Sequence, residues 1–203
     1  MINITGIDGC GKGTQLQHLA DYLTQKRRKI FLSKAYGPRE KEMFSLFIER
    51  AHDLTVMFLF QAMHVEQRMK AEKALQDGAI VLADRWDDAY FAYHSQYGML
   101  ADDAILRDKL NELAFGGIKP DVTFLLKVPV SVGMERCRLR GADFFDLKSA
   151  AHHQSKADYL DKMAAEHGWT VIDGERPHRE IHEEIVSSVQ PLIGTDEFHG
   201  GGH

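Results

Sequence analysis

The sequence predicts an α/β protein in which a sheet of five parallel strands carries helices on both faces. Short apolar runs alternate along the chain with longer segments of helical periodicity. Residues 79–83 form a continuous apolar run, which is typical of a parallel strand buried on both faces. A glycine-rich turn joins the first strand to the first helix. In such three-layer folds, ligands bind beyond the carboxyl ends of the strands.

The first half of the chain contains two of these strands. The first begins at Met1 and leads through the glycine-rich turn into a helix at 12–26. Apolar residues spaced three and four apart lie on one face of that helix: Leu16, Leu19, Ala20 and Leu23. The second strand is expected at 30–34, because Gly37-Pro38 interrupts the run. Two further helices are expected at 40–50 and 54–76, the second ending at the C-cap Asp77-Gly78.

The second half continues the alternation. Strand 79–83 is followed by helices at 87–97 and 102–115. Pro120-Asp121 precedes a strand at 122–128, Pro129 ends it, and Ser131 is expected to cap a helix ending near Arg140. A polar segment, 141–154, leads into a helix ending near 167. The remaining elements are a strand at 170–173, a helix at 177–192 and a glycine- and histidine-rich tail at 194–203, which we expect to be disordered.

Composition narrows the class of protein. The chain has 203 residues, 44% of them hydrophobic and 27% charged, as is ordinary for a globular protein. A formal net charge of -5 argues against a basic surface for nucleic acid polymers. No apolar run is long enough to span a membrane, and a first strand beginning at Met1 leaves no room for a signal peptide. The two cysteines, Cys10 and Cys137, form no disulfide framework. We therefore expect a cytoplasmic protein.

The turn after the first strand fits the phosphate-binding P-loop, G-x-x-x-x-G-K, from Gly6 to Lys12. Glycines allow positive φ angles and let the backbone approach a phosphate closely. The N–H groups of the loop and the start of the next helix then face the anion, and Lys12 adds a mobile charge for the β- and γ-phosphates. A three-layer P-loop NTPase fold is therefore predicted. The residues expected to bind ATP are Gly6, Gly9, Cys10, Gly11, Lys12, Gly13 and Thr14.

Mg²⁺ is expected to accompany ATP, although the P-loop departs from its usual pattern after the lysine. The usual Ser or Thr, whose hydroxyl holds Mg²⁺, is replaced by Gly13, and Thr14 comes one residue later. Either water holds Mg²⁺ for the most part, or Thr14 substitutes. Asp84, at the end of a buried strand, is the second candidate metal ligand. The neighbouring Arg85 can clamp a phosphate with two hydrogen bonds.

Three arginines before Gly141 form a cationic cluster, at 136, 138 and 140. Phosphoryl transfer develops charge on the equatorial oxygens, which arginines closing over the site can neutralise. At helical spacing Arg136 and Arg140 are neighbours, whereas Arg138 points away. Arg136 and Arg140 are therefore candidate catalytic residues, with a solvated helix face as the alternative.

These motifs together resemble the thymidylate kinase family, P-loop nucleoside monophosphate kinases that transfer the γ-phosphate of ATP to dTMP. The resemblance covers nearly the whole chain. Its most specific parts are the blocks at Asp84 and Lys119, because many unrelated NTPases share the P-loop. The segments that carry the resemblance are Gly6 to Lys12, Phe58 to Ala62, Asp84-Arg85-Trp86 with Ala92-Tyr93, Lys119-Pro120-Asp121, Val128-Pro129, and Arg140-Gly141 through Asp146.

The resemblance implies a role for several residues. Lys12 would hold the donor phosphates, while Asp8 and Arg85 would position and clamp the acceptor phosphate. Phe60 would stack on the acceptor base and Tyr93 would lie under its sugar. The family fold implies a single kinase domain at 1–193, with a short mobile lid at about 136–155. The reaction would convert dTMP and Mg·ATP into dTDP and ADP.

Several positions depart from the family pattern, mostly on the acceptor side. His64 stands where the family has an arginine that reads the thymine edge, and Ala89 and His94 replace Ser and Gln. In the lid, Phe144 replaces an arginine, and Cys10 leaves the P-loop without one. Two alternatives therefore stay open: a kinase for another nucleoside monophosphate, and an ATP-binding regulatory module that has lost transfer.

The resemblance also suggests a homodimer, with the helix at 54–76 as the candidate interface. This helix is more apolar than a single buried face requires. Packing within the core of one chain is the alternative explanation. The residues concerned are Val56, Phe58, Leu59, Met63 and Met69.

Overall fold

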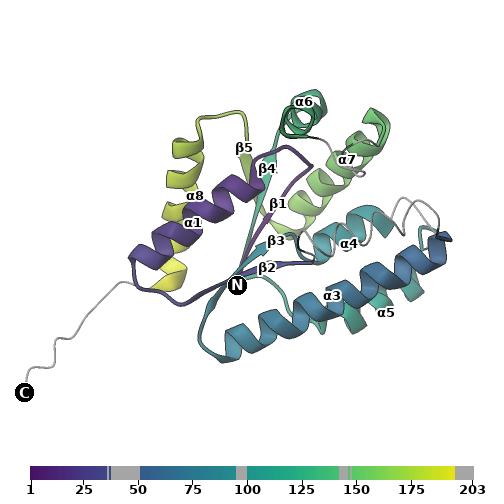
Figure 1. Cartoon of the computed structure of the whole chain (residues 1–203), viewed down its shortest axis with the longest axis horizontal. Helices are drawn as coiled ribbons and strands as arrows, with labels where there is room; N and C mark the ends of the chain where they lie inside the picture. The colour runs from purple at the N-terminus through teal and green to yellow at the C-terminus, as the bar shows by residue number, and fades with distance from the viewer. Residues whose placement is uncertain (36, 38–50, 95–99, 142–145, 147, 195–203) are drawn as a thin grey trace, which may run out of the picture.

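A computed structural model describes residues 1–35, 37, 51–94, 100–141, 146 and 148–194, with the backbone alone at 53, 93 and 94. Five parallel strands form one sheet in the order β2-β3-β1-β4-β5 (Figure 1). The chain therefore starts in the middle of the sheet, adds strands on one side and then on the other. The predicted fold class is confirmed. The strands are β1 (Ile2–Thr5), β2 (Ile30–Lys34), β3 (Ile80–Asp84), β4 (Val122–Lys127) and β5 (Thr170–Asp173).

Helices cover both faces of the sheet (Figure 1). α1 (Lys12–Gln25) and α8 (His178–Ile193) pack together on one face. The other face carries α3 (Asp53–Gln76), α4 (Asp87–His94), α5 (Ala104–Phe115) and α7 (Ala150–His167). α6 (Val130–Arg140) packs against α7 beyond the end of β4. This arrangement brings the starts of α1, α4, α6 and α8, each of which follows a strand, to the carboxyl edge of the sheet together with the glycine-rich turn.

The buried apolar residues form two clusters. In β3, Val81 and Ala83 face one cluster while Leu82 faces the other, because side chains alternate along a strand. Leu82 packs with the apolar stripe of α1, and its two neighbours pack with Trp86. Each fully buried Leu contributes roughly 1.5–3 kcal/mol by leaving water. The continuous apolar run of β3 therefore reflects burial on both faces.

Two helix starts differ from the sequence prediction. α6 begins at Val130 directly after Pro129, so Ser131 lies inside the helix rather than capping it. Proline at the helix start already has a suitable φ, here -54°, and needs no side-chain cap. α7 begins at Ala150, because the hydroxyl of Ser149 accepts a hydrogen bond from the His152 N–H at 3.2 Å. The expected polar segment is therefore shorter than predicted.

Other expectations are shifted slightly or lie outside the described residues. The third strand runs one residue later than predicted, so Asp84 is its last residue and pairs with Ile4 and Lys34. The predicted helix at 40–50, the tail from 195 and the lid positions 142–145 and 147 lie outside the described residues. Among the described helices, none has both the length and the apolar character needed to cross a membrane.

Candidate active site

A cavity of about 950 Å³ opens at the carboxyl ends of β1 and β3. It is lined by the glycine-rich turn, the start of α1, and residues of α3, α4, α6 and α7. Parallel strands place such a cavity where loops from different βα units meet. Most of the candidate site residues from the sequence line it.

The P-loop turns between Thr5 and Lys12, where three glycines have positive φ. Gly9, at φ +79°, touches α6 so closely that an added Cβ would lie 2.1 Å from the carbonyl oxygen of Gly133. Only a residue without a side chain fits this contact, which presses the loop against the base of α6. The loop is thus held from both sides, by β1 and by α6.

The start of α1 is open toward the cavity. Its N-cap, Gly11, supplies no side-chain hydrogen bond, and the first turn contains no acidic residue. The free N–H groups and the positive end of the helix dipole therefore face the cavity as an anion site. Lys12 curls back over the loop, and its Nζ donates to the carbonyl oxygens of Gly6 at 3.0 Å and Ile7 at 2.8 Å. A bound phosphate would compete for the same ammonium.

Asp8 is the centre of a charged cluster. Arg85 donates to its Oδ1 at 2.7 Å, and the ammonium of Lys156, on α7, lies 3.4 Å from its Oδ2. Burial alone would raise the pKa of the Asp8 carboxyl, but Arg85, Lys156 and Lys12 together hold it well below its usual range. Asp8 is therefore ionised at neutral pH, and the cations around it outnumber it.

The backbone of Arg85 adopts the left-handed conformation at φ +67°, which costs a non-glycine residue roughly 1–2 kcal/mol. Hydrogen bonds on both sides hold it there. Its N–H donates to the Ile4 carbonyl at 3.2 Å, and its own carbonyl accepts from Gln67 Nε2 at 3.1 Å. The next N–H, of Trp86, donates to Asp88 Oδ1 at 2.8 Å. This backbone directs the guanidinium toward Asp8 and the Gly6 carbonyl, which it reaches at 3.2 Å.

Asp88 is a buried brace beneath this turn. Its carboxylate also accepts from Asn3 Nδ2 at 2.8 Å and from the Thr5 hydroxyl, so it ties α4 to β1. Burial raises the pKa of Asp88, against the hydrogen bonds from Thr5 and Trp86 that favour the charged form. Asp88 thereby positions Arg85 through the backbone N–H of the next residue, Trp86.

The two predicted metal ligands both line the cavity. Thr14 is exposed in the first turn of α1, and Asp84 lies opposite at the end of β3, 3.1 Å from Lys34 Nζ. Burial alone would raise the pKa of Asp84, but Lys12, Arg85 and Lys34 lower it, so its oxygens are available as anionic ligands. In the part of the chain that the structure describes, no group of three His, Cys, Asp or Glu side chains could hold a metal. This donor set fits a hydrated Mg²⁺ completed by phosphate oxygens, and the role of both residues stays a prediction.

The predicted acceptor side of the cavity is lined by Phe60 and His64, both on α3. The His64 ring is buried and packs on Phe115, with ring centroids 5.0 Å apart. Burial lowers the pKa of His64 to about 4, and the opposing hydrogen bond with the Gln67 side chain does not restore it. His64 is therefore neutral at pH 7 and offers one donor at most. Tyr93 lies on α4, but its side chain is outside the described residues.

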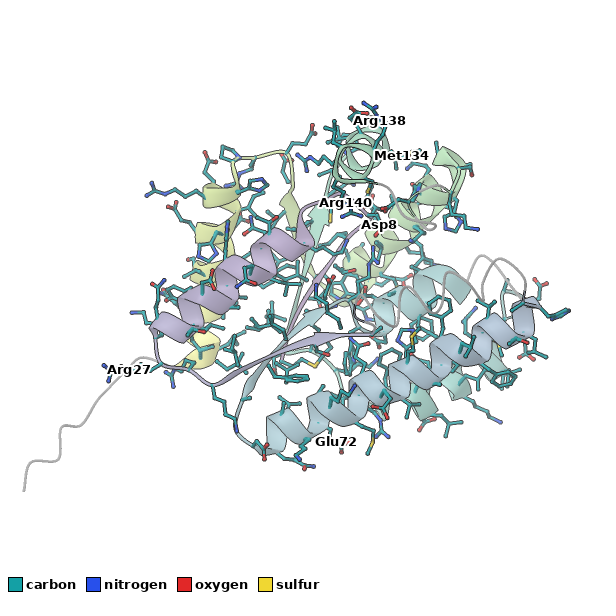
Figure 2. The ribbon with its side chains drawn as sticks, viewed as in Figure 1. Asp8, Arg27, Glu72, Met134, Arg138 and Arg140 are labelled. Carbon is teal, nitrogen blue, oxygen red and sulfur yellow. The ribbon has the colours of Figure 1, made fainter. Side chains whose placement is uncertain are left out.

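The arginines of α6 separate as their spacing predicts. Arg136 and Arg140 line the cavity, whereas Arg138 pairs with Glu135 at 2.7 Å on the outer surface (Figure 2). Arg136 donates to the carbonyls of Gly9 and Gly174, at 3.4 and 3.2 Å. Arg140 holds both carboxylate oxygens of a buried Asp146 at 3.0 Å. The catalytic roles of Arg136 and Arg140 stay predictions.

A family model described as thymidylate kinase matches residues 4–185. A thymidylate kinase of Trichlorobacter lovleyi is 36% identical over 204 residues, covering 93% of this chain and 95% of that protein. A thymidylate kinase of Geotalea daltonii is also 36% identical, over 208 residues with the same coverage, and one of Geotalea uraniireducens is 32% identical over 206 residues.

The chain belongs to the thymidylate kinase family. Its resemblance to that family, first apparent in the motifs at Gly6 and Asp84, is thereby confirmed. Family membership makes the chain a phosphotransferase that uses ATP. The P-loop, the anion site at the start of α1 and the cationic cluster around Asp8 are arranged as such an enzyme requires.

Sequence reasoning missed three residues of this site, namely Gln67, Asp88 and Lys156. Gln67 lies three residues after His64, about one helical turn, so its inward position could have been predicted from the spacing once α3 was placed. Asp88 lies four residues after Asp84, and nothing in the local sequence distinguishes it from the neighbouring Asp87. Lys156 lies four residues before Leu160 on the buried face of α7, which is an unusual place for a lysine.

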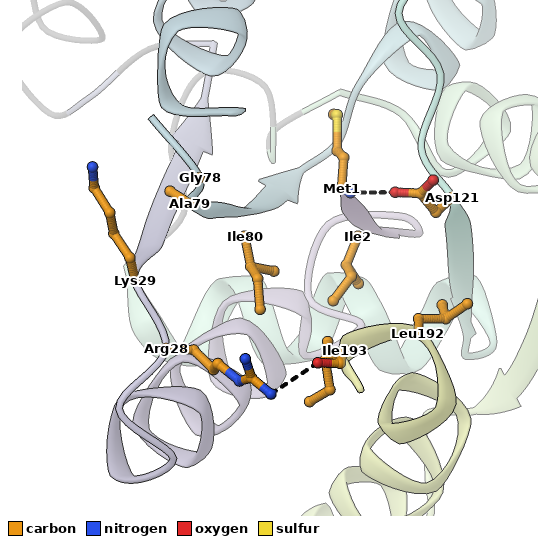
Figure 3. Close-up of a pocket in the computed structure, with 10 residues that line it drawn as sticks. All are labelled: Met1, Ile2, Arg28, Lys29, Gly78, Ala79, Ile80, Asp121, Leu192 and Ile193. Atoms are coloured by element: carbon orange, nitrogen blue, oxygen red, sulfur yellow. Dashed lines mark hydrogen bonds and ion pairs between the residues drawn. The ribbon is translucent and has the colours of Figure 1, made fainter. Parts of the chain in front are cut away.

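A second cavity, of about 370 Å³, lies at the opposite edge of the sheet (Figure 3). Its charged groups are already paired. Arg28 donates to the Ile193 carbonyl at 2.9 Å, and the amino group of Met1 pairs with Asp121. Lys29 donates to the Asp77 carbonyl at 3.0 Å. Among the residues of the thymidylate kinase motifs that the structure describes, only Asp121 lines this cavity.

Proposed function

We propose that the chain is a dTMP kinase that transfers the γ-phosphate of Mg·ATP to dTMP and releases dTDP and ADP. Two independent supports converge on this function. The family comparison covers nearly the whole chain, and its relatives bear the name thymidylate kinase. The observation that carries the proposal is the position of Asp8, between Arg85 on one oxygen and Lys156 on the other, beside the P-loop.

In the proposed reaction, an oxygen of the dTMP phosphate attacks the γ-phosphorus of ATP. The new P–O bond forms as the bond from the γ-phosphorus to the bridging oxygen breaks, and ADP leaves with that electron pair. The acceptor needs no general base, because a phosphate monoester is largely ionised near neutral pH. The protein supplies alignment and charge neutralisation, and these are the main contributions in phosphoryl transfer.

Each residue of the cluster has a distinct part in this proposal. The N–H groups of the P-loop and α1 hold the donor phosphates, and Lys12 leaves its carbonyl partners to bind the β- and γ-oxygens. Arg85 clamps the acceptor phosphate, directed by its braced backbone. Asp8 sets the position of Arg85 through their ion pair at 2.7 Å. Phe60 and His64 meet the acceptor base.

Mg²⁺ is proposed to bind with ATP, near Asp84 and Thr14. It would neutralise charge on the β- and γ-phosphate oxygens. The ionised carboxylate of Asp84 supports this position, as does the Thr14 hydroxyl at the start of α1.

A panel of acceptors tests the proposal. ADP and diphosphate formation is measured with Mg·ATP and each of dTMP, dUMP, dCMP, dGMP and AMP. The account predicts strong turnover of dTMP and none in Lys12→Ala, since the variant lacks the ammonium that meets the donor phosphates. Failure to phosphorylate any acceptor while ATP still binds would contradict it and would favour an ATP-binding module without transfer.

A second candidate, a kinase for another deoxynucleoside monophosphate, rests on His64. A buried, neutral ring cannot offer the forked pair of donors that an arginine would present to a thymine edge. If dTMP is the native acceptor, His64→Arg should raise its turnover. Preference for a different base in the panel, with no gain in His64→Arg, would favour this second candidate.

We also propose that the chain forms a homodimer through α3. Four apolar residues on this helix are exposed at spacings of four, seven and four, which places them on one face: Leu54, Phe58, Val65 and Met69. Phe58 is 56% exposed, whereas Val56 and Met63 are buried within the chain and belong to its core. A Phe58→Glu variant should sediment as a monomer while wild-type protein sediments as a dimer. A wild-type monomer at the same concentration would contradict the proposal.

A cytoplasmic location is proposed on the basis of the chain's nucleotide chemistry. Both cysteines are buried as free thiols, which fits a reducing compartment.

A further inference from the structure

Lys156 is a lysine on the buried face of a helix. It lies on α7, four residues before the buried Leu160, and its side chain is only 18% exposed. Lysine is almost never buried without a partner. Its ammonium lies 3.4 Å from Asp8 Oδ2 and it lines the cavity at the P-loop. A lysine that is largely buried and paired with a carboxylate of the active site calls for a functional explanation.

The charges around Asp8 leave a surplus of cations. Asp8 shares its two oxygens between Arg85 and Lys156, and Lys12 acts on the same carboxylate from the P-loop. Arg85 and Lys12 also repel Lys156, so the three cations lie near one another around a single anion. A cavity with this arrangement is favourable for phosphate groups, whose oxygens would relieve the repulsion.

The segment before Lys156 supplies little positive charge of its own. Residues 141–155 contain no arginine and one lysine, Lys148. The arginines that precede it on α6 are held elsewhere: Arg136 on the carbonyls of Gly9 and Gly174, and Arg140 on both oxygens of Asp146. On this side of the fold, Lys156 is a cation whose partner, Asp8, belongs to the proposed transfer site.

We propose that Lys156 is a catalytic residue whose ammonium leaves Asp8 to bind the equatorial oxygens of the phosphoryl group during transfer. The inference rests on the proposed kinase function. The acceptor oxygen forms its bond to the γ-phosphorus, the bond to the bridging oxygen breaks, and ADP takes the electron pair. Lys156 gives and takes no proton in this step. It neutralises charge that is greatest while the phosphoryl group lies between donor and acceptor.

Kinetics of three variants test the proposal. Lys156→Gln removes the charge and keeps hydrogen-bonding capacity, Lys156→Arg keeps the charge, and Lys162→Gln serves as the matched control. Lys162 lies on the same helix, is 66% exposed and pairs with Glu166. We expect Lys156→Gln to lower kcat for dTMP roughly 100- to 1000-fold, as loss of one preorganised donor does. KM for both substrates should stay within about threefold, and Lys156→Arg should recover part of the loss.

A transition-state mimic separates this role from a structural one. Aluminium fluoride with ADP and dTMP imitates the phosphoryl group in the transition state of transfer. This complex should therefore bind wild-type protein tightly and Lys156→Gln much more weakly. Binding of ADP alone and the thermal unfolding temperature should change little. A Lys156→Gln enzyme with kcat within threefold of wild type would overturn the role of Lys156 alone. A wild-type enzyme inactive with every monophosphate would overturn the kinase function and this inference with it.

Discussion

A methyl group added to the P-loop tests the close contact between that loop and α6. In Gly9→Ala, the left-handed backbone at φ +79° costs an L-residue about 1–2 kcal/mol. The new Cβ would also lie 2.1 Å from the Gly133 carbonyl oxygen, so loop and helix must separate. Overpacking of this kind costs about 1–3 kcal/mol. The free energy of unfolding should therefore fall by roughly 2–5 kcal/mol.

Gly13→Ala is the matched control, because it adds the same methyl group a few residues away. Gly13 lies in the first turn of α1, and nothing stands within 4 Å of an added Cβ. Alanine favours a helix over glycine by up to about 1 kcal/mol, so this variant should be as stable as wild type or slightly more stable. Urea unfolding measures both, with an expected fall in midpoint of roughly 1–2 M for Gly9→Ala. A Gly9→Ala variant within about 0.5 kcal/mol of wild type would refute the contact.

Three further predictions follow from single side chains. Arg85→Lys should lower kcat/KM for dTMP by about 100-fold through loss of the forked guanidinium, while Arg138→Lys, on the exposed face of α6, should match wild type. Burial holds the pKa of His64 at about 4, so its contribution to stability is present above pH 6.5 and is lost as the pH falls toward 4. Between pH 6.5 and pH 4, the free energy of unfolding should fall by about 3 kcal/mol more for wild type than for His64→Gln. Leu19→Ala should cost about 2–5 kcal/mol by calorimetry, against less than about 0.5 for the exposed Leu139→Ala.

The elements of the fold were largely predictable from the sequence because local signals and burial agree. β2 and β5 run from Ile30 to Lys34 and from Thr170 to Asp173, as predicted, since clear breakers bound each apolar run. The start of α7 was missed because Ser149 caps it within a polar segment that has no apolar periodicity before Leu160. Helix starts without an apolar first turn depend on a capping hydrogen bond that composition does not reveal.

The site was predicted in part, and the division has a physical cause. The P-loop and Arg85 are set by local chain geometry, so motif spacing alone brings them to the edge of the sheet. Lys156 comes from the far end of the chain and meets Asp8 only because α7 packs across the carboxyl edge, 148 residues later. The helical spacing of the three arginines on α6 correctly predicted that Arg138 points away from Arg136 and Arg140. It could not foresee that Arg140 would be held by Asp146.

Transfer of a labelled γ-phosphate tests the central claim most directly. ATP labelled at its γ-phosphorus is incubated with the enzyme and dTMP, and the label is followed into dTDP and inorganic phosphate. The account predicts label in dTDP only when dTMP is present, with little hydrolysis and no transfer in Lys12→Ala. Label that appears only in inorganic phosphate, or remains in ATP whatever the acceptor, would contradict the claim that this cavity is a phosphoryl-transfer site.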